Sequence, residues 1–168
     1  MGGDKQQFAE IVKAYQQVVA NITYKMSGDK LDVEEVCQQV FVELYTSLSR
    51  FRFESKLSTF IYSITVNVVN KALLQHGRYI SFDKAVIDSD AAEHGEDEKI
   101  EKEERRQMLR DAIGQLKPEQ RTALVLFSYE ELSYQEIADI MDSSLSKVES
   151  LIFRAKKNLK KIIENSLR

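Results

Sequence analysis

The chain has 168 residues, of which 43% are hydrophobic and 30% are charged, fractions typical of a soluble globular protein rather than a disordered one. Its single cysteine excludes an internal disulfide, and its polar N-terminus does not have the pattern of a secretory signal. No apolar run approaches the roughly 20 residues of a membrane span. We therefore expect a cytoplasmic protein without a span.

The net charge of -3 is distributed unevenly along the chain. Residues 1–78 carry 9 Lys and Arg against 8 Asp and Glu, residues 79–104 carry 3 against 10, and residues 105–168 carry 12 against 9. The two flanking parts are slightly basic, which permits nucleic-acid binding without showing it. The acidic middle part has an apolar group only at its start, so we predict a flexible linker between two domains with no large fixed interface.

The first part of the chain has helical periodicity. Apolar residues recur at helical spacing from Phe8 to Ile22, and residues 27–29 interrupt the pattern. Asp32 is a candidate N-cap of a second helix. A third helix is expected from Ser55 to about Gln75. The β-branched residues of that stretch also suit a strand, but its length without Gly or Pro favours a helix.

The last part predicts a helix-turn-helix. Pro118 is expected to begin a helix, and Ser133 with Glu136 three residues later has the pattern of a capping box. Asp142 follows at the turn, because aspartate tolerates a left-handed backbone. A second helix over residues 144–163 presents polar and basic side chains outward, and the start of such a helix can enter the major groove. A helical hairpin with a solvated lysine face is the competing interpretation.

Two long stretches carry a resemblance to a known family. They are LDVEEVCQQVFVELYTSLSRFRFESKLSTFIYSITVN and LKPEQRTALVLFSYEELSYQEIADIMDSSLSKVESLIFRAKKNLKKI. The first resembles region 2 and the second resembles region 4 of sigma-70 family factors, of the extracytoplasmic-function type. The resemblance implies an all-α protein with a region 2 bundle at residues 1–78, a linker at 79–104 and a region 4 helix-turn-helix at 105–168. It also implies an alternative sigma factor that binds core RNA polymerase and directs promoter-specific initiation.

The same resemblance implies partners and contact residues. In this family region 2 docks on the β′ clamp helices of core RNA polymerase and melts the -10 element of promoter DNA, while region 4 reads the -35 element and meets the β flap. The resemblance also implies an anti-sigma factor as a further candidate partner. The implied polymerase-docking residues are Asp32, Glu35, Val36, Gln38, Gln39 and Phe41. The implied -10 residues are Thr59, Phe60, Tyr62, Asn67, Asn70, Lys71 and Arg78. The implied -35 residues are Arg121, Ser146, Lys147, Ser150, Arg154, Lys156 and Lys157. Core packing is the alternative role for Val36, Phe41, Phe60 and Tyr62.

The sequence also departs from the family pattern. Basic residues are usual at several positions that are uncharged or acidic here, and Phe53 stands where glycine is usual. A basic residue is usual where Ser58, Ser63 or Val66 stands, and Lys or Arg is common where Glu149 and Leu151 stand. We therefore expect promoter contacts that are fewer or different.

The sequence gives little support to other chemistry. His76 and His94 lie in different segments without the spacing of a metal site, and Cys37 on an apolar stripe predicts a buried thiol. We expect no catalytic residue, metal or cofactor. A stand-alone helix-turn-helix regulator and a helical interaction protein remain the competing functions.

Overall fold

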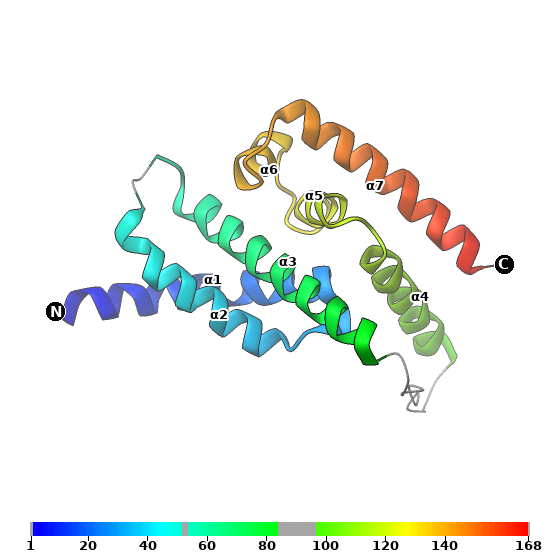
Figure 1. Ribbon diagram of the computed structural model, residues 1–168, viewed down its shortest axis with the longest axis horizontal. Helices are drawn as coiled ribbons and strands as arrows, with labels where there is room; N and C mark the ends of the chain where they lie inside the picture. Colours follow the sequence, from blue (N-terminus) through cyan, green and yellow to red (C-terminus); the bar gives the residue numbers. More distant parts are fainter. Residues whose placement is uncertain (1, 52–53, 84–96, 168) are drawn as a thin grey trace.

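The computed structural model describes the backbone of residues 2–51, 54–83 and 97–167, and the side chains of residues 5–51, 54–77 and 102–167. These residues form seven α-helices, two short 3-10 turns and no strand, which confirms the predicted all-α fold. Helices α1–α3 form an N-terminal bundle, and α4–α7 form a C-terminal half beside it (Figure 1).

The N-terminal bundle is built as the local sequence signals predict. It consists of α1 (Gly2–Ser27), α2 (Val33–Ser47) and α3 (Leu57–Asp83), with 3-10 turns at Gly28–Lys30 and Leu48–Arg50. Gly28 follows α1 in a left-handed conformation, with φ of 57°, which costs glycine little. The predicted N-cap is confirmed, because Asp32 Oδ1 accepts a hydrogen bond of 3.0 Å from the Glu35 N–H. The fully buried core side chains include Ile22, Val40, Leu44, Ile61 and Val69.

Helix α3 is longer than the sequence predicts. It continues beyond Gln75 to Asp83, because a glycine inside a helix, here Gly77, costs only about 1 kcal/mol relative to alanine and does not stop it. Helix α4 (Asp97–Gly114) begins within the predicted linker. The linker of residues 79–104 is therefore helical at both ends, and its centre, residues 84–96, lies outside the described residues.

One stretch of α3 corrects the expectation about apolar runs. Within the part of the chain that the structure describes, residues 57–77 are the one stretch long and apolar enough to cross a membrane by length and composition. In this fold Ile61, Thr65 and Val69 of that stretch are at most 1% exposed and fill the protein core. We therefore interpret α3 as the central core helix.

The C-terminal half contains the predicted helix-turn-helix. After α4 come α5 (Pro118–Ser128), α6 (Tyr134–Ile140) and α7 (Leu145–Ser166), and Pro118 is the first residue of α5 as expected. The capping box is confirmed, since the Ser133 N–H donates to Glu136 Oε2 at 3.0 Å and the Glu136 N–H donates to Ser133 Oγ at 3.2 Å. The Ser133 N–H and the Ser133 hydroxyl both donate to Glu136 Oε2, and these two bonds hold the pKa of Glu136 below its usual value. Asp142 makes the turn with φ of 46°.

The two halves share one apolar core, so the prediction that they lack a large fixed interface is wrong. Ile61 and Val66 of α3 belong to the same buried cluster as Val125 of α5 and Ile137 of α6. Helix α5 lies against α1, and α6 lies against α3. Residues 61 and 66 lie about 140° apart around a helix. The burial of both shows that α3 packs on two sides, and the helices packed against it are α1 and α2 of the N-terminal bundle and α6 of the C-terminal half.

We predict that the chain unfolds in one cooperative transition, because its apolar core is continuous between the halves. Leu44→Ala in the N-terminal bundle and Leu126→Ala in the C-terminal half should each lower the free energy of unfolding by about 2–5 kcal/mol in that same transition. Leu167→Ala is the control, because this side chain is 70% exposed. Urea unfolding followed by circular dichroism and by tyrosine fluorescence measures the effect. Two separate transitions, each sensitive to one substitution only, would contradict a shared core.

A second prediction concerns the cap of α7. Ser144 Oγ accepts a hydrogen bond of 3.2 Å from the Lys147 N–H, so Ser144→Ala should cost roughly 0.5–2 kcal/mol of stability. Ser150→Ala, at an exposed position inside the same helix, should change stability by about 0.5 kcal/mol or less. Thermal and urea denaturation compare the two variants. Equal losses would show that the Ser144 hydroxyl does not act as a cap.

Candidate polymerase and promoter interfaces

The outer face of α2 is polar and accessible. Asp32, Glu35, Gln38 and Gln39 are all exposed, so four of the six implied docking residues are available to a partner. Val36 is only 5% exposed and belongs to the apolar core. A direct docking role for Val36 is therefore wrong in this structure, because its side chain supports the helix from the inside.

Phe41 is half-buried and lines a groove between α1 and α2 that the sequence analysis missed. The groove has a volume of about 600 Å³. Val42 and Tyr45 line it and are 64% and 52% exposed. The Tyr45 ring meets the Phe8 ring edge to face, with centroids 5.0 Å apart. The available signal was that Val42 and Tyr45 fall outside the buried stripe of α2, where apolar side chains have no core to fill.

Cys37 also lines this groove and is half-buried. Burial raises the pKa of its thiol, although a hydrogen bond with Thr23 acts in the opposite direction. A raised pKa keeps the thiol protonated and weakly reactive. This fits the predicted structural role, although the side chain is less buried than expected.

The implied -10 residues of α3 lie on two adjacent faces. Asn67 and Lys71 are exposed, and Phe60 is half-buried and packs against Phe51 with ring centroids 4.8 Å apart. Tyr62 and Asn70 lie on the neighbouring face. There the Tyr62 hydroxyl donates to Glu130 Oε2 at 3.5 Å, and Asn70 Nδ2 donates to Thr122 Oγ1 at 3.1 Å. The C-terminal half therefore contacts this second face. The side chain of Arg78 lies outside the described residues.

Thr59 lines a polar cleft between the start of α3 and the helix-turn-helix. The cleft has a volume of about 700 Å³ and is lined by residues of both halves. Four carboxylates line it against one lysine, Lys56, whose Nζ lies 3.8 Å from Glu136 Oε1. The other three carboxylates are those of Glu54, Asp139 and Asp142. The excess of negative charge makes the cleft unfavourable for a nucleic-acid phosphate.

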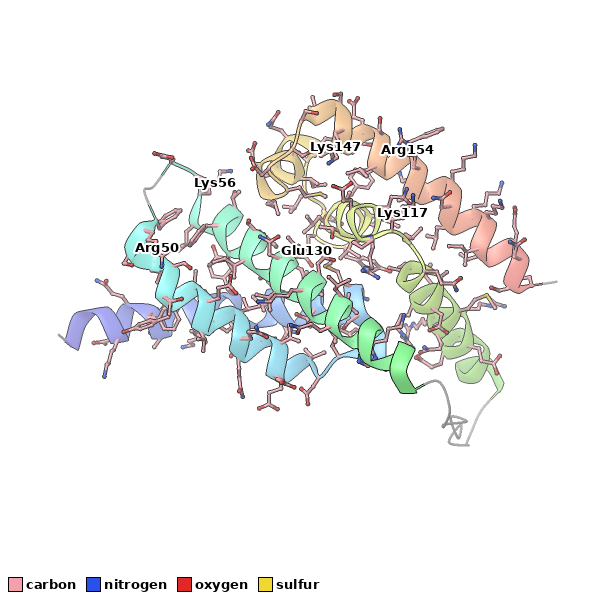
Figure 2. All side chains as sticks on the ribbon, viewed as in Figure 1. Arg50, Lys56, Lys117, Glu130, Lys147 and Arg154 are labelled. Atoms are coloured by element: carbon pink, nitrogen blue, oxygen red, sulfur yellow. The ribbon has the colours of Figure 1, made fainter. Side chains whose placement is uncertain are left out.

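The outer face of α7 carries the implied -35 residues. Figure 2 shows Lys147 near the start of α7 and Arg154 about two turns further along it. Both are exposed, as are Ser146, Ser150, Lys156 and Lys157. Two of the lysines already have partners: Lys147 Nζ pairs with Glu119 Oε1 at 2.9 Å, and Lys156 Nζ lies 4.7 Å from the centre of the Phe127 ring. Leu151, which replaces a usual basic residue, is 6% exposed and packs inward.

Arg121 corrects the -35 prediction. It is only 6% exposed, and its Nη1 donates to the Gly114 carbonyl at 3.2 Å while its Nε has no partner. Burial lowers the pKa of this guanidinium. Residues 120–126 of α5 are all buried, because α5 packs against α1, α6 and α7. Arg121 therefore does not face DNA in this structure.

Phe153 is a residue that the sequence analysis missed. It is 70% exposed on α7, three positions after Ser150 and next to Arg154. The available signal was its position outside the inner stripe of Val148, Ile152 and Ala155. A large aromatic side chain on an otherwise polar helix face loses contact with water when a partner covers it, and this favours a binding role.

In the described part of the chain, potential metal ligands are dispersed. Among them, no group of three or more His, Cys, Asp or Glu residues is placed to hold a metal ion. One accessible feature is the polar outer face of α2 beside the apolar groove between α1 and α2. The other is the capped helix α7, whose outer face carries lysines and Arg154. Such features suit the binding of macromolecules.

Known proteins match both halves of the chain. The family model of Sigma-70 region 2 matches residues 11–79, and the model of Sigma-70, region 4 matches residues 106–159. The chain is 33% identical to the RNA polymerase sigma-H factor of Pseudomonas aeruginosa and 33% identical to the ECF RNA polymerase sigma-E factor of Escherichia coli K12. Each alignment covers 99% of this chain and 91% of the relative.

A solved structure has the same fold. The sigma factor RpoE of Bartonella quintana, crystallised in complex with the anti-sigma factor NepR, has a TM-score of 0.70 at 18% identity, over 95% of this chain and 98% of that one. The region 2 match falls on α1–α3, and the region 4 match extends from α4 into α7. Family models that match both halves, together with relatives that are 33% identical over 99% of the chain, show that the chain belongs to the extracytoplasmic-function group of the sigma-70 family.

Proposed function

We propose that this chain docks on core RNA polymerase through the outer face of α2, reads the -10 element with α3 and reads the -35 element with α7. As a member of its family, the chain is an alternative sigma factor that directs transcription initiation. One observation carries the division of labour: the accessible polar face of α2 and the capped helix-turn-helix lie in different halves of the chain. A stand-alone DNA-binding regulator needs only α6 and α7. That function would not explain why the N-terminal half matches Sigma-70 region 2.

The docking surface that we propose combines polar and apolar parts. Glu35, Gln38 and Gln39 offer hydrogen bonds on α2, and the neighbouring groove offers Val42 and Tyr45 for burial. A helix of the partner suits such a surface, because its apolar side chains fill a groove while its polar ones reach the rim. The β′ clamp helices of polymerase are the partner that the family implies.

The proposed -35 reader is the first half of α7. Ser146 and Ser150 can hydrogen-bond to base edges, Arg154 can bind a guanine or a phosphate, and Phe153 can contact a thymine methyl group. Lys157 adds positive charge for the DNA backbone. On the -10 side, Asn67 and Lys71 are exposed and suited to a base edge and a phosphate.

Further partners follow from the relatives. Because the Bartonella RpoE was crystallised with an anti-sigma factor, we propose that an anti-sigma factor also regulates this chain. We place its activity in the cytoplasm, where polymerase and the chromosome are found. The catalytic chemistry of RNA synthesis then belongs to the polymerase, and the chain contributes binding.

The docking proposal predicts the effect of two substitutions on α2. Glu35→Ala combined with Gln38→Lys should weaken binding to core polymerase about tenfold, or about 1.4 kcal/mol, with no loss of helix. Glu164→Ala combined with Asn165→Lys makes the same charge change at exposed positions of α7 and should leave the affinity unchanged. Titration of labelled chain with core enzyme measures both. Equal affinity of the two double variants would contradict docking through α2.

The -35 proposal predicts that Arg154→Ala weakens binding to duplex promoter DNA. The loss should be about 1–3 kcal/mol if Arg154 reads a base, and smaller, sequence-independent and salt-dependent if it contacts phosphate. Lys13→Ala is the control, since it removes one exposed positive charge from α1. Polarisation titrations of holoenzyme at several salt concentrations give the comparison. The same loss for both variants would remove Arg154 from the interface.

A further inference from the structure

We propose that Glu149 determines base specificity in α7, by accepting a hydrogen bond from the N4 amino group of a cytosine in the upstream promoter element. This inference deepens the proposed function and rests on α7 being the reader of that element. Glu149 is the one acidic residue among residues 145–163, whose other charged residues are all Lys or Arg. An acidic side chain on an otherwise basic helix opposes attraction to DNA phosphate, so a general role in DNA affinity does not explain it.

Glu149 lies where a helix-turn-helix reaches bases. It is in the second turn of α7, and its side chain is exposed, as are those of Ser150 beside it and Phe153 one turn later. Val148 and Ile152 are at most 2% exposed, and they anchor this part of α7 in the core. The first turns of the second helix are the part of a helix-turn-helix that contacts base edges in the major groove. The position of Glu149 therefore suits direct contact with a base.

The Glu149 carboxylate has no ion-pair partner in the described part of the chain. Lys147, two residues before it, pairs with Glu119 at 2.9 Å. Arg154 lies about 140° away around the helix, and Figure 2 shows it on α7 beyond Lys147. The residues one turn from Glu149 carry no positive charge; they are Leu145, Ser146, Ile152 and Phe153.

A role in helix stability does not explain Glu149 either. The field of a helix N-terminus favours a carboxylate mainly within the first turn, whereas Glu149 is in the second. The side chain also lacks a cation three or four residues away, which is the spacing that stabilises a helix through ion pairs. In the free protein the carboxylate is therefore solvated and available to a partner.

The chemistry of base edges selects cytosine as that partner. A carboxylate only accepts hydrogen bonds, and in the major groove guanine offers two acceptors while thymine offers one acceptor and a methyl group. Adenine offers its N6 amino donor beside the N7 acceptor, which repels a carboxylate. Cytosine offers its N4 amino donor without an adjacent acceptor. Glu149 therefore favours cytosine and disfavours guanine most strongly.

The surroundings of Glu149 strengthen this discrimination. Phe153 is 70% exposed and one turn away, so its ring excludes water from the carboxylate when α7 lies in the groove. A hydrogen bond is stronger where water is excluded, and a carboxylate without a donor is more costly there. Repulsion from phosphate lowers the affinity for every duplex, and the cytosine contact offsets it on one sequence only. The difference between correct and incorrect sequences therefore widens.

Selection from randomised duplex DNA tests the base assignment. Holoenzyme made from core polymerase and the full chain is incubated with promoter duplexes randomised over the upstream element, and the bound DNA is sequenced. The parent should select cytosine at one position. Glu149→Arg should select guanine there, because arginine binds O6 and N7 of guanine, and Glu149→Gln should select adenine. Glu164→Arg makes the same charge change at an exposed position near the end of α7, and it should keep the cytosine.

The selected bases separate base reading from a general effect of charge. An upstream element that is the same for the parent and every Glu149 variant would overturn the role of Glu149, even if Glu149→Arg binds all duplexes more tightly. Selection by the parent of a base other than cytosine at the position that responds would overturn the assignment to cytosine. A parent holoenzyme that selects no upstream sequence would contradict the -35 proposal as well.

A modified base tests the hydrogen bond itself. N4-methylcytosine still pairs with guanine, but a methyl group replaces the hydrogen that faces the groove. At the selected position it should weaken binding of the parent holoenzyme at least about fivefold, and binding of Glu149→Ala by less than about twofold. Equal losses for the two proteins would show that Glu149 does not accept this hydrogen bond, and would overturn the inference.

Discussion

Helix α3 must bury apolar side chains on two sides, and the arrangement of the whole molecule follows from this requirement. Ile61 and Val66 lie about 140° apart around the helix, yet they are 1% and 3% exposed. Helices α1, α2 and α6 pack against α3, and Thr122 of α5 accepts a hydrogen bond from Asn70 of α3. The hydrophobic effect thereby joins two halves that the charge pattern suggests are independent. The outer faces of α2 and α7 do not pack against α3, and they stay accessible.

The parts of the fold that the sequence predicts well depend on neighbouring residues. Caps at Asp32, Ser133 and Ser144 bind backbone N–H groups three residues further on, so their partners can be identified from spacing alone. The turn at Asp142 and the first residue of α5 are equally local. The end of α3 was predicted too early, because glycine at residue 77 lowers helix propensity without removing a backbone hydrogen bond.

The parts that the sequence does not predict depend on contacts between distant segments. A helical pattern identifies one apolar stripe, but the second buried side of α3 is recognisable only when α5 and α6 lie against it. The prediction for Arg121 fails for the same reason. An arginine in a region 4 stretch suggests DNA binding, but α5 is buried and Arg121 donates to the Gly114 carbonyl instead. Val42, Tyr45 and Phe153 were missed for the opposite reason. Their exposure, rather than their residue type, identifies them as candidate contacts.

The central claim is that the chain gives core RNA polymerase the ability to start transcription at particular promoters. The most direct test is transcription in vitro with core enzyme, with and without the purified chain, on a pool of templates with randomised upstream sequence. The account predicts that the chain enriches transcripts from templates that share two short elements at a fixed separation, one duplex and one melted. Transcription indistinguishable from that of core enzyme alone, from a folded chain, would contradict it.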